Sequence, residues 1–180
     1  MRCRSLEYEM TYDEALEYIH GISWTFCKPG LDRIRTLCDG LGNPQDGLKF
    51  VHVAGTNGKG SLTALVSSVL TAAGYKTGVY TSPHLVSYCE RMVIDGVEIS
   101  EEELFGLAED VKPAIDRMED KPTEFELLTA MALLYFARQR CDIVLLEVGL
   151  GGRLDATNVI SAPEAAVIMN IGLDHVQILG

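Results

Sequence analysis

The feature that most constrains this chain is a glycine-rich loop, Gly55 to Ser61, which lies between two apolar segments of different period. The segment before it, Lys49 to Ala54, has the composition of a buried strand. In the segment after it, Leu62 to Ala73, apolar residues recur at helical spacing on one face. A second strand is expected at Lys76 to Tyr80. Strand, loop, helix and strand in this order predict a parallel βαβ unit.

The remaining segments extend this unit into an α/β fold with a mostly parallel sheet and helices on both faces. Asp95 and Gly96 lie between two β-prone runs in Met92 to Ile99, the pattern of a hairpin with a type I′ turn. Two segments open with capping boxes and are expected to be helices, although Pro113 weakens this expectation for the second half of the first. The other expected elements are helices at 12–20, 31–41, 100–118 and 125–137, the last buried on nearly every face, and strands at 142–148 and 165–170.

Composition limits the classes of protein to consider. A chain of 180 residues with 47% hydrophobic and 23% charged residues is an ordinary globular domain. Its 15 Lys and Arg residues against 26 Asp and Glu residues give a net charge of −11, which argues against nucleic-acid and anionic-membrane partners. The sequence has no apolar run near the roughly 20 residues that cross a bilayer and no signal-peptide pattern. Five cysteines without a C-x-x-C pair favour reduced thiols in a cytoplasmic protein.

The glycine-rich loop has the composition of a phosphate-binding loop. Glycines let several backbone N–H groups converge on one anion, the following helix adds its positive end, and Lys59 adds a full charge. The strict Walker pattern fails, because Gly60 separates Lys59 from Ser61. The alternative is a plain glycine-rich turn, but the order of strand, loop and helix favours phosphate binding. His52, on the strand before the loop, fits a packed core residue better than a catalyst.

Several polar residues follow expected strands and are candidates for metal or substrate binding. Glu147 ends an apolar strand and Ser82 follows a neighbouring one, which suits a carboxylate and a hydroxyl on Mg²⁺. The alternatives are a paired glutamate and a turn serine. For His175 the spacing leaves a surface residue and a ligand equally open, since Mg²⁺ prefers oxygen. In the loop Gly149 to Asn158, Arg153 suits either an anionic ligand or an exposed position.

Taken together and in order, these motifs resemble the folylpolyglutamate synthase/dihydrofolate synthase family, a branch of the Mur ligases. In this family, too, a glycine follows the loop lysine, as Gly60 follows Lys59 here. The resemblance extends from about residue 10 to residue 180. The segments that carry it are Pro29 to Ile34, His52 to Ser61, Thr81 to Leu85, Glu147 to Asn158 and Leu173 to His175.

The resemblance implies a P-loop NTPase-like Mur ligase central domain that uses ATP and Mg²⁺. It assigns the phosphates of ATP to Gly55, Thr56, Asn57, Gly58, Lys59, Gly60 and Ser61. Lys59 and His175 would be catalytic, Ser82 and Glu147 would hold one Mg²⁺, and His175 would belong to a second metal position. The region around the pterin would be lined by Phe125, Glu126, Gly152, Arg153, Leu154 and Asp155.

The activity implied is ATP-dependent amide formation between L-glutamate and the carboxylate of dihydropteroate or a folate, through an acyl phosphate. Proteins of this family are much longer, with a carbamylated lysine after the Asp-His motif and a C-terminal glutamate-binding domain. We therefore expect residues 1–180 to form one ATP-binding domain, incomplete at its C-terminal end and inactive alone.

Other functions stay open on the sequence. A non-catalytic nucleotide-binding fragment and another Mur-type amino-acid ligase are both compatible with the motifs. A P-loop kinase is disfavoured, because no Ser or Thr directly follows Lys59. We expect small-molecule substrates, no nucleic acid and no membrane, a monomeric parent protein, and self-association of the short chain through uncovered apolar surface.

Overall fold

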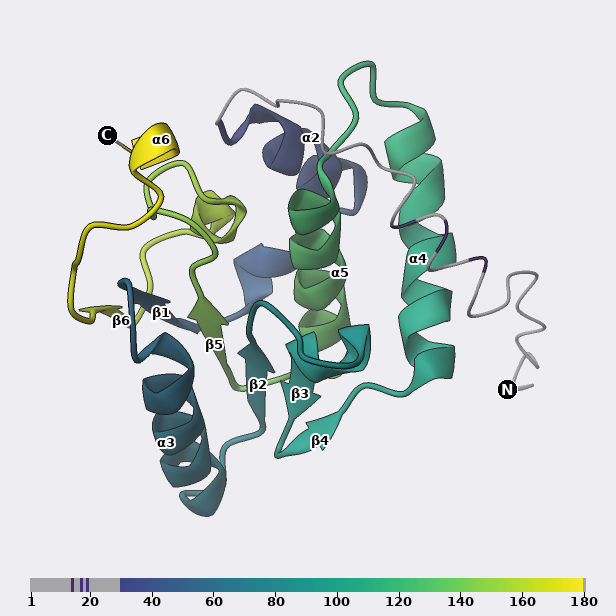
Figure 1. Ribbon diagram of the computed structural model, residues 1–180. Helices are drawn as coiled ribbons and strands as arrows, with labels where there is room; N and C mark the ends of the chain where they lie inside the picture. The colour runs from purple at the N-terminus through teal and green to yellow at the C-terminus, as the bar shows by residue number, and fades with distance from the viewer. Residues whose placement is uncertain (1–13, 15–16, 18, 20–29, 180) are drawn as a thin grey trace.

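The computed structural model describes residues 14, 17, 19 and 30–179 of the chain. Its centre is a six-stranded sheet in the order β4-β3-β2-β5-β1-β6 (Figure 1). Strands β2, β5, β1 and β6 run parallel, and β3 and β4 form an antiparallel hairpin at one edge. The strands are β1 (Phe50–Ala54), β2 (Thr77–Tyr80), β3 (Met92–Ile94), β4 (Val97–Glu98), β5 (Ile143–Glu147) and β6 (Ala165–Ile168).

Helices cover both faces of the sheet, as predicted. Helix α3 packs on one face, while α2, α4 and α5 gather on the other (Figure 1). The larger apolar core lies on the side of α5, which is buried over most of its length. The helices are α2 (Asp32–Gly40), α3 (Lys59–Ala72), α4 (Glu101–Asp116), α5 (Glu124–Arg138) and the short α6 (Val176–Leu179), with single helical turns η1 (Pro44–Gly47), η2 (Tyr88–Arg91) and η3 (Ala156–Val159).

The hairpin between β3 and β4 has the turn that its sequence predicts. Asp95 and Gly96 have φ angles of 51° and 82°, the positive values that a type I′ turn requires at both central positions. The Asp95 carboxylate also accepts a hydrogen bond from the backbone N–H of Thr77 at 2.8 Å. This bond ties the turn to the beginning of β2, so the hairpin is fixed to the parallel part of the sheet.

Both predicted capping boxes begin helices. Ser100 and Glu103 form one before α4, and Thr123 and Glu126 form the other before α5. In each box the hydroxyl accepts from the backbone N–H three residues on, and the glutamate accepts from the backbone N–H of the capping residue. These bonds satisfy donors that a helix leaves free at its beginning.

Pro113 does not interrupt α4, which corrects the doubt about the second half of this helix. Proline removes one backbone hydrogen bond from a helix interior and crowds the carbonyl four residues earlier. Pro113 is exposed, whereas Val111, Ala114 and Ile115 around it are buried. The apolar side of the helix therefore packs on the core along its whole length, and tertiary packing outweighs the local preference.

The apolar face predicted for α3 is only half buried. Leu62 and Val66 pack on the layer that contains Val51 and Val53 of β1. Leu65 and Val69 are 69% and 67% exposed. The apolar stripe on α3 is therefore wider than the contact of this helix with the sheet.

The N-terminal predictions lie mostly outside the described residues. Of the helix expected at 12–20, residues Glu14, Glu17 and Ile19 are described and are helical, and Ile19 is fully buried. None of the helices in the described part of the chain combines the length and the apolar character that crossing a bilayer requires.

We predict that Gly78→Ala destabilises the fold by about 1–3 kcal/mol, the usual cost of overpacking a core. A Cβ at this position on β2 would lie 2.7 Å from Cδ1 of Phe136, whose side chain is fully buried in the core. Chemical denaturation would measure the loss. Gly47→Ala is the matched control, because a Cβ there would contact nothing within 4 Å. Equal stability of the two variants would contradict the prediction.

Candidate functional site

The loop between β1 and α3 follows a path that only glycine permits. Gly55 has a φ angle of 134°, and Gly58, at the beginning of α3, has a φ angle of 83°. A Cβ at Gly55 would lie 2.7 Å from Cβ of Met169 and 3.1 Å from the carbonyl oxygen of Asn170. The loop backbone therefore lies directly against the segment that follows β6, as required of a turn that must bend sharply within a packed site.

Asn170 binds the first part of this loop from the other side. Its carbonyl oxygen accepts from the N–H of Thr56 at 2.9 Å, and its side-chain oxygen accepts from the N–H of Asn57 at 3.1 Å. The N–H of Gly172 donates to the Thr56 hydroxyl at 3.0 Å. Two amides assigned to phosphate by the resemblance thus bind Asn170, and the amides from Gly58 onward are the better candidates. Asn170 is not among the predicted site residues, because its only signal in the sequence is its place at the end of an expected strand.

Lys59 and Glu147 form the charged centre of the site. Nζ of Lys59 donates to the carbonyl oxygen of Gly55 at 2.9 Å and lies 3.9 Å from Oε1 of Glu147. Glu147 is 6% exposed, and this burial raises its pKa, while Lys59 and a hydrogen bond from the backbone of Ser82 act in the opposite direction. The predicted loop lysine, metal carboxylate and metal hydroxyl residue therefore lie together.

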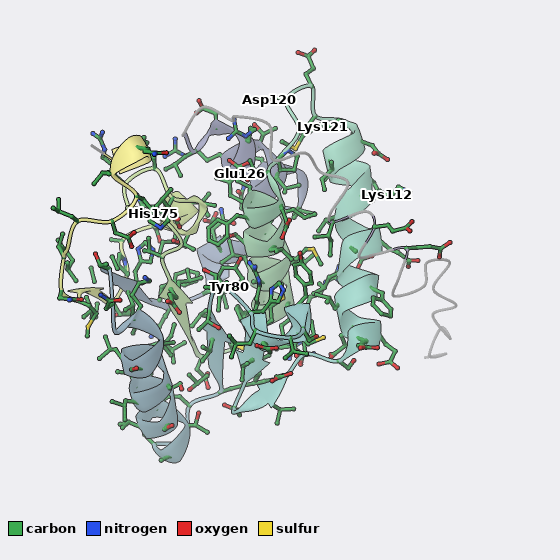
Figure 2. The ribbon with its side chains drawn as sticks, viewed as in Figure 1. Tyr80, Lys112, Asp120, Lys121, Glu126 and His175 are labelled. Carbon is green, nitrogen blue, oxygen red and sulfur yellow. The ribbon has the colours of Figure 1, made fainter. Side chains whose placement is uncertain are left out.

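A cavity of about 210 Å³ opens beside this centre. One wall is the glycine-rich loop with Lys59, a second is the segment Gly149 to Gly151, and a third is the segment after β6 with His175. Figure 2 shows His175 beside the last helical turn, across the sheet from Lys112 on α4. Within the described residues, no group of three or more His, Cys, Asp or Glu side chains could hold a metal ion. His175 therefore shares the cavity with Lys59 but belongs to no such cluster.

The loop that carries Ser82 is fixed by the turn η2 that follows it. The Glu90 carboxylate accepts from the backbone N–H groups of Leu85, Val86 and Ser87 at 2.7–2.8 Å. Nε of Arg91 donates to Nδ1 of His84 at 2.9 Å. The three amide bonds lower the pKa of Glu90.

Arg91 also lies under an aromatic group. Its guanidinium carbon is 5.4 Å from the centre of the Tyr88 ring, and the rings of His84 and Tyr88 are 4.3 Å apart. Arg91 is only 9% exposed, and its contacts with His84 and Tyr88 both bury its charge and fix the loop. No spacing or motif in the sequence predicts this arrangement of His84, Tyr88 and Arg91.

Phe125 and Glu126 were both predicted to line the substrate region, and the structure separates them. The Phe125 ring lies where a side chain of residue 149 would go: a Cβ on Gly149 would be 2.6 Å from Cζ. Phe125 thus contacts the beginning of a loop that lines the cavity. Glu126 is buried and turned towards the protein interior.

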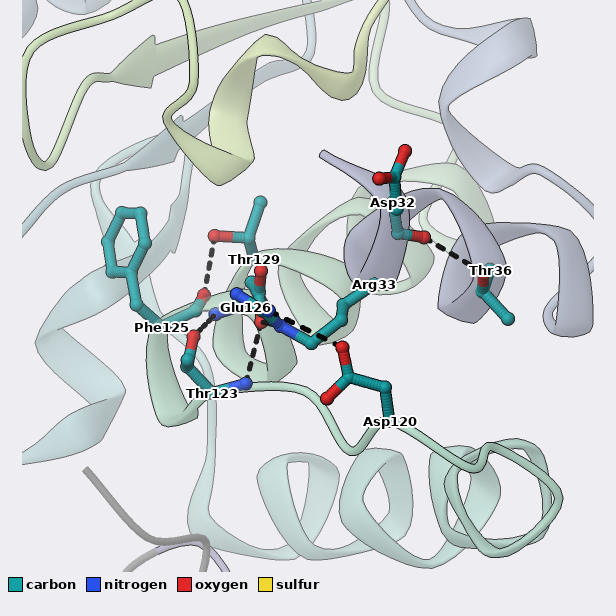
Figure 3. Close-up of polar contacts among 8 residues, drawn as sticks. All are labelled: Asp32, Arg33, Thr36, Asp120, Thr123, Phe125, Glu126 and Thr129. Atoms are coloured by element: carbon teal, nitrogen blue, oxygen red, sulfur yellow. Dashed lines mark hydrogen bonds and ion pairs between the residues drawn. The ribbon is translucent and has the colours of Figure 1, made fainter. Parts of the chain in front are cut away.

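Figure 3 shows the partners of Glu126. Its Oε2 accepts from the backbone N–H of Thr123 at 2.7 Å and from Nε of Arg33 at 2.9 Å. Arg33 also pairs with Asp120 at 3.5 Å. These contacts fix the beginning of α5 against α2, so the carboxylate of Glu126 serves the packing of helices.

The predicted substrate residues of the loop after β5 also differ in exposure. Arg153 and Leu154 are exposed, and Gly152 has a φ angle of 153°. Asp155 is buried and accepts a hydrogen bond from the backbone N–H of Leu150 at 2.8 Å. Arg153 and Leu154 are therefore free to meet a ligand in solution, whereas Asp155 shapes the loop from within.

The cysteines of the described region are poor nucleophiles. Burial raises the pKa of Cys38 to about 12 and that of Cys141 to about 11. It also raises the pKa of Cys89. A nucleophilic cysteine needs a thiolate, and these thiols are protonated at neutral pH. Cys3 and Cys27 lie outside the described residues.

Comparisons with known proteins point to one family. Residues 53–180 match the Mur ligase middle domain. The chain is 45% identical over 174 residues to the dihydrofolate synthase/folylpolyglutamate synthase of Bacillus subtilis. The match covers 94% of this chain and 40% of that protein. The chain thus spans well under half the length of this curated relative.

Solved structures give the same result. An FPGS–AMPPCP–folate complex superposes with a TM-score of 0.91 at 39% identity, covering 95% of this chain and 43% of that one. FolC of E. coli in complex with DHPP and ADP superposes with a TM-score of 0.87 at 40% identity, covering 96% of this chain and 41% of that one. The first of these structures therefore contains AMPPCP and folate, and the second contains DHPP and ADP.

We predict that the amides of Leu85 to Ser87 titrate with Glu90. The pKa of Glu90 is lower in the folded protein than in the unfolded chain. Its ionised carboxylate therefore stabilises the fold at pH values above the pKa of the unfolded chain, and this stabilisation is lost as the pH falls through the pKa of the folded protein. We expect the amide resonances of these residues to shift with a midpoint below the ordinary glutamate pKa of about 4.3. Glu90→Gln should abolish the transition, and Glu98→Gln on β4 should retain it. A midpoint at or above the ordinary value would contradict the assignment.

Proposed function

Because the chain belongs to the Mur ligase family, we propose that it is the ATP-binding part of a folylpolyglutamate synthase/dihydrofolate synthase. The parent enzyme would join L-glutamate to the carboxylate of dihydropteroate or a folate at the expense of ATP. The observation that carries this proposal is the cavity between the glycine-rich loop and Gly149 to Gly151, with Lys59 in its wall and the buried Glu147 3.9 Å from that lysine. The relatives solved with nucleotide and folate compounds support the choice of ligands.

The phosphates of ATP would bind at the beginning of α3. No side chain of the described residues caps this helix, so its first amides are available to an anion, and Lys59 adds a positive charge. In the present state Nζ of Lys59 binds the carbonyl oxygens of Gly55 and Thr56. A phosphate oxygen is a stronger acceptor than a neutral carbonyl, so we expect Lys59 to turn to the ligand.

Magnesium fits the donor set beside this helix. The Glu147 carboxylate and the Ser82 hydroxyl would offer oxygen ligands, which Mg²⁺ prefers, and waters would complete its shell. Burial raises the pKa of Glu147, so a cation in addition to Lys59 would stabilise the ionised carboxylate. When bound, Mg²⁺ would neutralise charge on the transferring phosphoryl group. His175, on the opposite wall of the cavity, would serve a second metal position.

The reaction needs alignment and charge neutralisation more than a protein nucleophile. A substrate carboxylate oxygen attacks the γ-phosphorus of ATP, the bond to ADP breaks, and an acyl phosphate forms. The amine of glutamate then attacks the acyl carbon, loses a proton, and phosphate leaves. Lys59 would stabilise the charge that develops during the first step. Phe125, Gly152, Arg153 and Leu154 would face the pterin side, with Asp155 and Glu126 shaping that region.

We also propose how this part fits the whole protein. Residues 1–180 would form a single ATP-binding domain that needs the rest of the parent enzyme to bind glutamate. The parent would be a cytoplasmic monomer. The exposed apolar side chains of Leu65 and Val69 on α3 and of Ile168 on β6 favour self-association of the short chain.

Two other functions give different outcomes in one experiment. The longest reading frame that contains this chain is incubated with ATP, Mg²⁺, glutamate and dihydropteroate or tetrahydrofolate, and ADP release and the amide product are measured. We expect both ADP release and the amide product. If neither dihydropteroate nor tetrahydrofolate reacts, the folate assignment is overturned. A different acceptor carboxylate would indicate another Mur-type ligase. ATP binding without any turnover would indicate a nucleotide-binding protein.

We predict that Lys59→Met weakens Mg–ATP binding roughly 10- to 100-fold, the effect of losing a hydrogen bond to a charged group. The methionine keeps the aliphatic stem of the lysine and removes its charge. Isothermal titration calorimetry would measure the affinity, and a thermal melt would show that the domain stays folded. Lys112→Met on α4 is the control and should bind as the wild type does, because Lys112 lies far across the molecule from His175, which lines the cavity (Figure 2). Equal affinity of both variants would contradict the role of Lys59.

A further inference from the structure

His52 lies at the middle of β1, beside Leu146 of β5 and Ala166 of β6. Side chains alternate along a strand, and its neighbours Val51 and Val53 belong to the apolar layer under α3. The imidazole of His52 therefore lies on the opposite face, where the loop after β5 covers the sheet. Its Nε2 is 2.8 Å from the hydroxyl oxygen of Thr157.

The Thr157 hydroxyl continues this contact to Asp155. It lies 2.5 Å from Oδ1 of Asp155, which also accepts from the backbone N–H of Thr157 at 3.0 Å. Oδ2 of the same carboxylate accepts from the backbone N–H of Leu150 at 2.8 Å. Asp155 and Thr157 are 5% and 0% exposed, so water does not compete for these bonds.

The direction of each bond follows from the inventory of donors. The carboxylate of Asp155 accepts backbone N–H groups at both oxygens, so the hydroxyl of Thr157 donates to it. The hydroxyl has one proton, and its oxygen then accepts from Nε2–H of His52. Burial lowers the pKa of His52, with Asp155 acting in the opposite direction, and a neutral ring can still donate from Nε2.

We infer that His52 is a positioning residue: through Thr157 and Asp155 it holds the backbone of Leu150 in the wall of the cavity. Leu150 lines the cavity together with Gly149 and Gly151, opposite the glycine-rich loop. His52 lies on the strand that leads directly into the glycine-rich loop. One strand therefore sets the position of both walls, the first through its backbone and the second through this side chain.

Hydrogen exchange of the Leu150 amide tests this chain of bonds. Thr157→Val removes the hydroxyl and keeps the shape of the side chain, and we expect exchange at Leu150 to become roughly 10- to 100-fold faster, the loss of a bond to a charged group. Thr157→Ser restores the hydroxyl and should restore slow exchange. His52→Ala should also accelerate exchange, while the amide of Leu145 in β5 stays protected in every variant that folds.

Thr36→Val is the matched control, because the Thr36 hydroxyl donates to the carbonyl oxygen of Asp32 in its own helix and, among the described residues, to no atom of the loop after β5. It should leave exchange at Leu150 unchanged. If Leu150 exchanges at the wild-type rate in Thr157→Val and His52→Ala, the side chains do not hold this backbone and the inference is overturned.

A second measurement needs no variant. The long-range ¹H–¹⁵N correlation spectrum of the wild-type imidazole shows which ring nitrogen carries the proton. We expect the proton of His52 on Nε2. A proton on Nδ1 alone would make Nε2 an acceptor, reverse the direction of the bonds and overturn the inference, even if Thr157→Val fails to fold.

The consequence for ligands rests on the proposed function. We expect the dissociation constant for Mg–ATP to rise roughly 3- to 10-fold in His52→Ala and Thr157→Val and to stay at the wild-type value in Thr157→Ser. If the wild type binds no ATP, the proposed function fails, while the exchange and tautomer measurements still decide the positioning role. If ATP binds and its affinity is equal in all variants although Leu150 exchanges faster, the role of His52 in placing the cavity wall is overturned.

Discussion

The site depends on the close approach of two backbones, at Gly55 and at Met169 to Asn170. A Cβ at residue 55 would overlap this contact, so the absence of one side chain lets the loop after β1 meet the loop after β6. Asn170 then binds Thr56 and Asn57, which fixes the beginning of the loop and leaves its end open at Gly58. Among the described strands β6 pairs with β1 alone, at the edge of the sheet, so the two strands and their loops form one unit. The third wall of the cavity, with His175, is placed by the same contact.

Electrostatics explains why the centre of this unit is charged. Burying a carboxylate costs free energy unless a cation or hydrogen-bond donors compensate it. Glu147 has Lys59 at 3.9 Å and a backbone hydrogen bond from Ser82, and its pKa is raised nonetheless. The compensation is therefore incomplete. A site of this kind gains from a second cation next to Glu147 and from an anion next to Lys59, which is the combination that Mg–ATP supplies.

Local patterns predicted most of the fold, and distant contacts account for what they missed. The turn at Asp95 and Gly96 and both capping boxes involve residues at most three apart, so the sequence contains the whole interaction. Asn170 bonds to Asn57 across 113 positions, and no spacing rule could pair them. At Pro113 the local pattern was misleading. Proline disfavours a helix interior, but the packing of α4 on the core outweighs this preference. The position of the candidate site followed from the ends of parallel strands, whereas the hydrogen bonds that hold it did not.

Neighbouring residues of one motif can serve different purposes, and Phe125 with Glu126 shows why. Successive residues of a helix point about 100° apart, so only one of two neighbours can face a given loop. Glu126 faces Arg33 and the backbone of Thr123, and this fixes where α5 begins. Phe125 consequently faces Gly149, two residues after Glu147, and leaves no room for a side chain there. The ion pair of Arg33 and Glu126 therefore influences the site through the neighbouring ring of Phe125. Packing can thus constrain a residue as strongly as contact with a ligand does.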